Sequence, residues 1–206
     1  MVDVRNLQAL QLDALREVAN IGAGHAATAL SQMTGSRIMV TVPRLQIAPL
    51  EEVPELLGNP EEVVAAVLMH MLGDLTGRTL LLFPRDDALR LSEILLARPR
   101  GGSHVFGELE QSALKEAGNI LSAAYMNALA DFMGLLLLPS VPSLVIDLCG
   151  AVLTTVCTNF QAERDFVLSI ETKFTMEDER DSVSGHFLLI PDVQSLQVIL
   201  ECIRMA

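Results

Sequence analysis

The chain has 206 residues, of which 50% are hydrophobic, and its formal net charge at pH 7 is -12. This length and apolar content exclude a disordered chain and suit one large domain or two small ones with a buried core. The acidic balance argues against a nucleic-acid partner, because unspecific binding to nucleic acid depends on lysines and arginines that neutralise phosphates.

The first predicted element is a helix over residues 5–33. This segment lacks proline, and its apolar residues recur on one helix face: Leu7, Leu10, Ala14, Val18 and Ile21. Gly35 follows as a predicted C-terminal stop, and residues 37–42 are predicted as a strand that ends at Pro43.

Further strands are predicted where short apolar runs lie between turn residues. In chain order they cover residues 63–71, 79–83, 144–157, 166–174 and 186–190. The apolar stretch 134–153 contains two prolines and an aspartate, so we interpret it as buried strand and not as a membrane span. Helices are predicted at 86–97, about 107–133 and 192–204. Because runs of strands are bracketed by helices, the pattern predicts an α+β layered fold with a mainly antiparallel sheet.

Three polar residues of the first helix and a later proline recur 99 residues further on. The two copies read Asp13-x3-Glu17-x2-Asn20-x22-Pro43 and Ser112-x3-Glu116-x2-Asn119-x22-Pro142. A second correspondence, at an offset of 107 to 108, relates the segments that begin at Gly77 and Gly185. Such a long period predicts an internally duplicated domain over residues 1–206, with halves of about 1–105 and 106–206, and not a solenoid array.

The repeated polar residues share one side of their helix. At 100° per residue, an arc of about 60° contains Asp13, Glu17 and Asn20. This arc is separate from the apolar stripe of the helix. Like charges four residues apart and an asparagine inside a helix are both mildly unfavourable, so this pattern indicates a functional role. A solvated helix face is the alternative, and the recurrence in register makes it the weaker one.

A glutamate and an asparagine suit a reaction whose attacking water lacks only position. The asparagine amide can hold a water by hydrogen bonds, and the glutamate can pair with a lysine of a partner. Hydrolysis of an acyl phosphate such as phosphoaspartate fits this description, because phosphoryl transfer is catalysed chiefly by positioning and electrostatics. The metal and the lysine would then belong to the substrate protein.

The doubled motif, with Asn20-Ile-Gly-Ala-Gly-His-Ala-Ala-Thr-Ala-Leu-Ser31 after its first copy, resembles the CheC family of chemotaxis phosphatases, the CheC/CheX/FliY group. The resemblance covers essentially the whole chain and is greatest to free-standing members with two motif copies. It implies dephosphorylation of a phosphorylated CheY-type response regulator that carries Mg²⁺, while this chain binds no cofactor itself. The residues implied as catalytic are Glu17, Asn20, Glu116 and Asn119, with Asp13 and Ser112 flanking them.

The resemblance also implies a fold and a second partner. The fold is a pseudo-two-fold arrangement with a six-stranded sheet and two symmetry-related motif helices. The second partner is CheD, a receptor-modifying deamidase. The alternative hypothesis is a non-catalytic binding module that sequesters the phosphorylated regulator or CheD.

The two copies differ just after the asparagines, where Gly22-Ala-Gly24-His25 stands against Leu121-Ser-Ala123-Ala124. Gly24 and Ala27 continue the motif face and would admit another backbone, whereas Met126 replaces Ala27 in the second copy. We therefore predict unequal sites; the alternative is that the glycines serve helix packing within the protein. The same glycines match a loose dinucleotide fingerprint, but a helix and not a strand precedes them, so we reject nucleotide binding.

Other features receive structural interpretations. The chain starts without a basic segment followed by an apolar run, so we expect no secretory signal, no membrane insertion and a cytoplasmic location. Neither the three cysteines nor the four histidines show metal-ligand spacing, so we expect buried thiols and no metal site. Pro43 and Pro142 are predicted to end strands and to fix the loops that follow.

Overall fold

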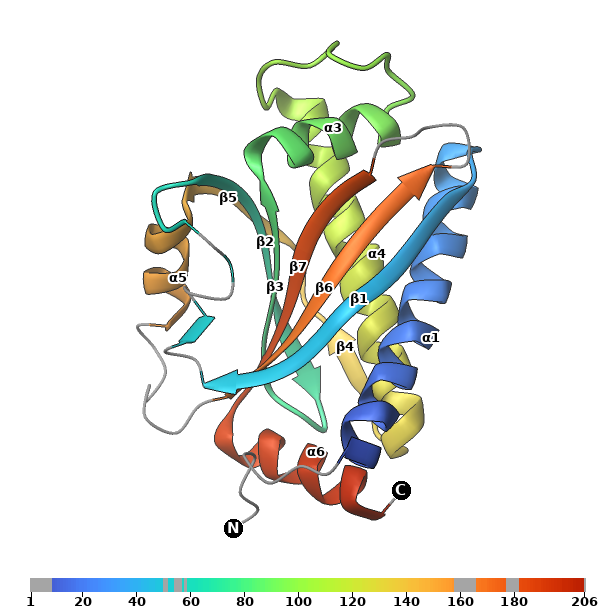
Figure 1. The fold of residues 1–206 in the computed structure, drawn as a ribbon, viewed down its shortest axis with the longest axis vertical. Coiled ribbons are helices and arrows are strands. Elements are labelled where there is room, and N and C mark those ends of the chain that lie inside the picture. The colour runs from blue at the N-terminus through green and yellow to red at the C-terminus, as the bar shows by residue number, and fades with distance from the viewer. Residues whose placement is uncertain are drawn as a thin grey trace.

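The computed structural model describes residues 9–49, 52–53, 57, 59–157, 166–176 and 182–205. Its elements are α1 (Ala9–Thr34), β1 (Ile38–Pro49), β2 (Val63–Gly73), β3 (Gly77–Pro84), α3 (Arg85–Leu95), α4 (Glu108–Met133), β4 (Leu137–Pro139), β5 (Ser143–Leu148), α5 (Cys149–Cys157), β6 (Phe166–Met176), β7 (Ser182–Pro191) and α6 (Val193–Met205). Figure 1 shows α1 and α4 running in opposite directions along one face of a twisted sheet.

The predicted long helices are confirmed, and they repeat the offset of the sequence motif. Both α1 and α4 have 26 residues, and their first described residues are 99 positions apart. Gly35 and Gly134 follow them with φ of 67°, the left-handed conformation in which glycine commonly ends a helix. Residues 5–8 of the first predicted helix lie outside the described part.

The sheet is antiparallel throughout, with the strand order β1-β6-β7-β3-β2-β4 and β5 also paired with β2. The expected six strand positions are present, and the sixth is divided between β4 and β5. Each half of the chain pairs its first strand with the hairpin of the other half, because β1 pairs with β6 while β4 and β5 pair with β2. The two halves therefore build one sheet around the central pair β3 and β7.

Symmetry also extends to the hydrogen bonds at the starts of α3 and α6. The Ser184 amide donates to Asp87 Oδ2 at 3.2 Å, and the Thr76 amide donates to Ser195 Oγ at 2.8 Å. Both pairs are related by an offset of 108 residues. The second correspondence in the sequence thus reflects an equivalent attachment of each helix to the central hairpin of the other half.

The prediction that Pro43 ends a strand is wrong. β1 runs through Pro43 to Pro49, and its register against β6 shifts between Thr41 and Arg44, where β1 has one residue more than its partner. Such a bulge accommodates a proline because the extra residue is left out of the ladder. Pro142 lies between β4 and β5, so there the same position interrupts the strand.

The predicted strand over 144–157 is wrong beyond residue 148, and the stretch 134–153 is not one buried strand. β5 is exposed at five of its six residues, and α5 follows directly. Four residues at helical spacing are buried in α5: Cys149, Val152, Leu153 and Val156. This spacing lets α5 cover the sheet face opposite α1 and α4.

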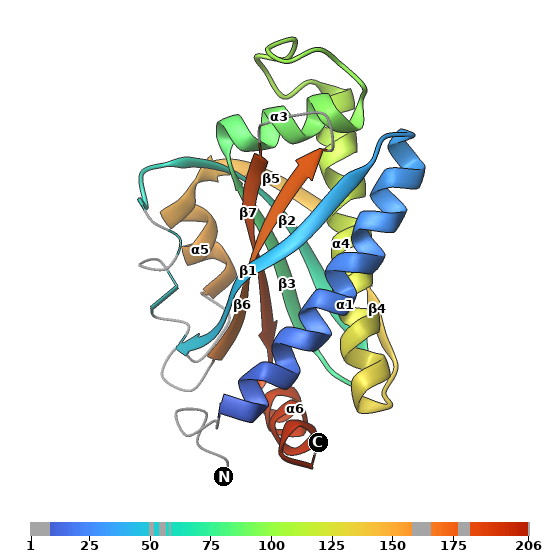
Figure 2. The ribbon, with the colours of Figure 1, turned by 45° about the vertical axis from the view of Figure 1, so that its right-hand side comes forward.

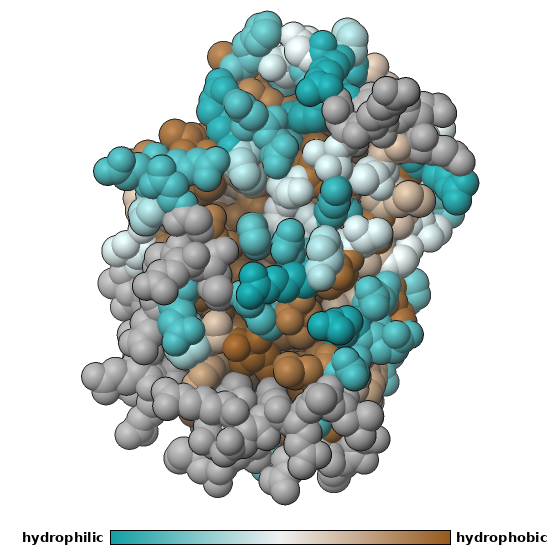
Figure 3. Space-filling view, viewed as in Figure 1, coloured by the Kyte–Doolittle hydropathy of each residue, from teal (hydrophilic) through white to brown (hydrophobic). Residues whose placement is uncertain are grey.

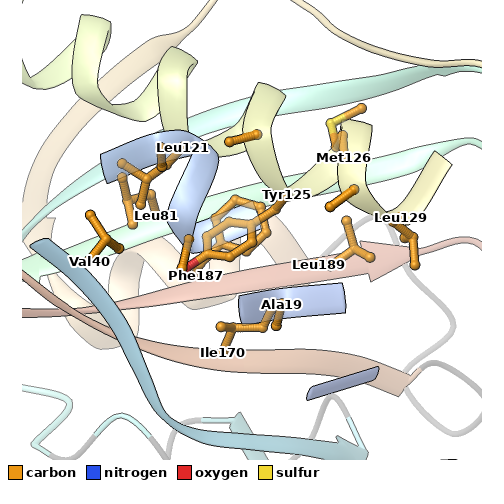
Figure 4. Packing of buried hydrophobic residues seen from close by; sticks show 14 of the residues in the cluster. Ala19, Val40, Leu81, Leu121, Tyr125, Met126, Leu129, Ile170, Phe187 and Leu189 are labelled. Atoms are coloured by element: carbon orange, nitrogen blue, oxygen red, sulfur yellow. The ribbon is translucent and has the colours of Figure 1, made fainter. Parts of the chain in front are cut away.

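Apolar side chains fill the space between the sheet and the two long helices. Figure 4 shows Tyr125 of α4 beside Phe187 of β7, with Ala19 of α1 and Ile170 of β6 nearby. The rings of Tyr125 and Phe187 have centroids 4.7 Å apart. The middle of the opposite sheet face is polar (Figure 3), where Arg44, Glu171 and His186 are in register across three strands.

Polar contacts hold residues 99–103, the segment that joins the two halves. The Ser103 amide donates to Glu93 Oε1 at 2.8 Å, and Arg98 pairs with Glu110 at the start of α4. Hydrogen bonding lowers the pKa of both carboxyl groups. The segment between the halves is therefore anchored on both sides, while the boundary near residue 105 stays a prediction.

Candidate functional site

The first motif lies on the exposed side of α1. Leu15, Val18 and Ala26 are buried, whereas Asp13, Glu17, Asn20 and Gly24 are exposed on the other side. The expectation that the polar line faces solvent is therefore confirmed for this copy. Figure 2 shows the length of α1 free of any covering element on its outer side.

The second motif lies on α4 in the same orientation. Leu114, Ala117 and Leu121 are buried, Ser112 and Glu116 are exposed, and Asn119 is half-buried. The backbone of α4 packs closely against the sheet at Gly118, where an added Cβ would lie 2.5 Å from Val67 Cγ1. This contact fixes the rotation of α4 about its axis and with it the direction of the next residue, Asn119.

The four side chains expected to act have no polar partner within the described part of the chain: Glu17, Asn20, Glu116 and Asn119. Each carboxylate and each amide is therefore available to an external molecule. A partner protein that approaches either helix can reach both groups together, since they are three residues apart on one helix face.

The flanking positions differ in charge. Asp13 lies 3.7 Å from Arg16, and their side chains are 68% and 55% exposed, so this ion pair is weak. Ser112 supplies only a hydroxyl at the equivalent place. The first site therefore presents two carboxylates in line, and the second site presents one.

The glycines after Asn20 have two different roles. A Cβ at Gly22 would lie 2.7 Å from Tyr125 Cδ1 and 3.0 Å from Tyr125 Cα, so Gly22 permits the contact of α1 with α4. Among the described residues, a Cβ at Gly24 would meet no atom within 4 Å. The packing alternative thus holds for Gly22, and Gly24 remains an open position on the motif face.

A hollow of about 560 Å³ continues this face at the end of α1, where Ala27, Thr28 and Ser31 contribute to its lining. Ser31 Oγ is fixed there, since it accepts from the Ile38 amide at 2.9 Å. At the position of α4 equivalent to Ala27, Met126 is fully buried, and at the position equivalent to Gly24, Ala123 is half-buried. The surroundings of the two motifs are therefore unequal in shape.

The residues that orient the two helices were not predicted from the sequence. Tyr125 is buried, its hydroxyl lies 3.1 Å from Thr172 Oγ1, and burial raises its pKa to about 12. Gly118 and Gly22 complete the contacts described above. A tyrosine and two helix-interior glycines close to a polar motif were the available signal.

The prolines of the motif lie at the two edges of the sheet. Pro43 is in β1, which packs against α1, and Pro142 follows β4, which packs against α4. Their place supports a structural role and gives no reason to assign them chemistry.

Within the described residues, no group of three or more metal-ligating side chains occurs, and no helix is long and apolar enough to cross a membrane. Cys149 is buried and Cys202 is half-buried, and both are free thiols.

Comparisons with known proteins match the segments that carry both motifs. The CheC-like family matches residues 10–47 and 109–146, which contain both motif copies. The CheY-P phosphatase CheC of Bacillus subtilis (strain 168) is 33% identical over 189 residues, which cover 91% of this chain and 90% of that protein. The putative CheY-P phosphatase CheC1 of Halobacterium salinarum is 23% identical over 203 residues, 98% of either chain. In fold, the crystal structure of Thermotoga maritima FliY matches with a TM-score of 0.80 and 18% identity, covering 97% of this chain and 98% of that one.

Proposed function

Because this chain belongs to the CheC-like family, we propose that it hydrolyses the aspartyl phosphate of a CheY-type response regulator in chemotaxis signalling. The observation that carries this proposal is the pair of solvent-accessible Glu-x2-Asn sites, whose side chains have no polar partner among the described residues. The alternative, a binding module that sequesters the phosphorylated regulator or CheD, uses the same surfaces without chemistry.

In the proposed mechanism, each site completes the active site of its substrate. The side-chain amide of Asn20 or Asn119 enters the phosphorylated pocket and holds a water in line with the P–O bond to the aspartate. An amide donates and accepts hydrogen bonds but is no general base, so its contribution is position. The water oxygen bonds to phosphorus, the aspartate oxygen leaves, and the products are aspartate and inorganic phosphate.

Glu17 and Glu116 have the docking role in this mechanism. Each carboxylate lies one helical turn before its asparagine and is exposed, so it can pair with a lysine beside the regulator's phosphoryl group. This pairing would orient the amide and the water relative to the phosphorus. In this proposal the Mg²⁺ of the reaction belongs to the regulator, where it would neutralise charge on the phosphoryl oxygens.

The direct test is the decay of phosphate from a purified, phosphorylated CheY-type regulator in the presence of Mg²⁺. We expect catalytic amounts of this protein to accelerate the decay and to release inorganic phosphate. A decay rate equal to that of the regulator alone, combined with measurable binding, would support the sequestering module instead.

A further inference from the structure

The two sites are displaced from each other along the pair formed by α1 and α4. Gly22 of α1 is opposite Ala124 and Tyr125 of α4, and the helices are antiparallel (Figures 1 and 2). With an offset of 99 residues, the pseudo-two-fold axis therefore passes close to Gly24 and Ala123. Each site asparagine precedes this midpoint by four residues, about 6 Å on its own helix, so the two are offset by about 12 Å along the pair.

Asn20 and Asn119 each face away from the other motif helix. At 100° per residue, Gly22 is 200° from Asn20 around α1, so the asparagine faces away from α4. On α4, the residues that contact α1 are Ala124 and Tyr125, which are 140° and 240° from Asn119 around the helix axis. Asn119 therefore also faces away from α1. The two sites therefore lie on opposite flanks of the helix pair and not on a shared surface.

The distance between the two site asparagines is smaller than the diameter of a substrate regulator. A globular domain of about 100 residues has a radius of gyration near 13 Å, which corresponds to a diameter of roughly 35 Å. Helices pack about 8–10 Å apart and are about 10–12 Å wide, so the tips of the two asparagines are only about 20–25 Å apart. Two regulators that approached from the same side would collide, whereas regulators on opposite flanks have centres about 55 Å apart.

We propose that the chain binds two phosphorylated regulators at once, one on each flank, and hydrolyses both independently. This inference rests on the proposed function. The duplication would then double the number of regulators that one chain can dephosphorylate at the same time. It would not merely give one regulator two alternative binding sites.

Stoichiometry tests the inference directly. A regulator loaded with Mg²⁺ and beryllofluoride, a stable stand-in for the phosphoryl group, is titrated against this protein by calorimetry, and the mass at saturation is measured by light scattering. We expect two regulators per chain for the wild type, one for Glu17→Lys or Glu116→Lys, and none for the double variant. Glu61→Lys makes the same charge change at an exposed position outside the motifs and is expected to keep two.

Turnover gives a second readout that does not require tight binding. If both sites work at the same time, the wild-type kcat equals the sum of the kcat values of Glu17→Lys and Glu116→Lys. If one bound regulator excludes the other, the wild-type kcat lies between the two single-site values, and one regulator is bound at saturation. The latter results overturn the inference but leave the phosphatase intact, whereas unaccelerated decay in the wild type would refute the proposed function itself.

Discussion

Gly22 and Tyr125 face each other where α1 crosses α4, and their counterparts in the duplication are Leu121 and Ala26. At both pairs of positions the smaller residue is on α1 and the larger one is on α4. Each duplicated position therefore carries a small residue in one half and a large one in the other, although α1 and α4 have the same length and the same motif spacing.

The first prediction concerns this contact. Gly22→Ala is expected to destabilise the protein by about 1–3 kcal/mol, because the added Cβ meets the Tyr125 backbone as well as its ring, and overpacking outweighs the gain in helix propensity. Gly24→Ala is the matched control, since its Cβ meets nothing, and it is expected to stabilise by up to about 1 kcal/mol. Urea unfolding measures both; equal effects of the two alanines would contradict the close packing of the helices at Gly22.

The second prediction concerns the amides. Asn20→Ala combined with Asn119→Ala is expected to reduce stimulated dephosphorylation about 10²–10³-fold, the loss found when one oriented polar group is removed from a reaction centre. Each single variant should keep the activity of the remaining site. Asn127→Ala, an exposed asparagine of α4 outside the motif, is the control with unchanged activity. Full activity in the double variant would remove the asparagines from the mechanism.

The third prediction concerns the unequal flanking residues. In a Glu116→Lys background, where only the first site acts, Asp13→Ser is expected to raise KM by up to about fivefold, because an exposed carboxylate contributes at most about 1 kcal/mol. Arg16 already neutralises part of the Asp13 charge, and kcat should not change. The reciprocal Ser112→Asp in a Glu17→Lys background should lower KM, and both effects should shrink with added salt. A change in kcat with constant KM would assign Asp13 a different role.

The sequence was sufficient for the features that depend on local periodicity. The two long helices, their glycine stops and the exposed motif face follow from spacing within one segment, and the structure has them in place. Duplication added the pseudo-symmetry, since two segments with the same pattern adopt the same conformation.

Features that depend on distant partners were not predictable in this way. The bulge at Pro43 exists because β6 pairs on both sides of it, and the pairing of each first strand with the opposite hairpin joins segments more than 60 residues apart. α5 was missed because its apolar composition resembles that of a strand, although the spacing of Val152, Leu153 and Val156 is helical. Which side of α1 faces α4 became clear only from the Gly22 contact.

The last prediction concerns pH. Burial raises the pKa of Tyr125 to about 12, against about 10 for an exposed tyrosine in the unfolded chain. The contribution of the protonated, buried phenol to the free energy of unfolding is therefore fully present below pH 10. It is lost as the pH rises through 12, because the unfolded state releases the phenol proton at a lower pH than the folded state. Two pKa units correspond to about 2.7 kcal/mol. The difference in unfolding free energy between the wild type and Tyr125→Phe should shrink by about 2 kcal/mol from pH 9 to pH 12, where the folded phenol is half ionised. Parallel pH profiles of the two proteins would show that the phenol is not shielded at the contact between the helices and the sheet.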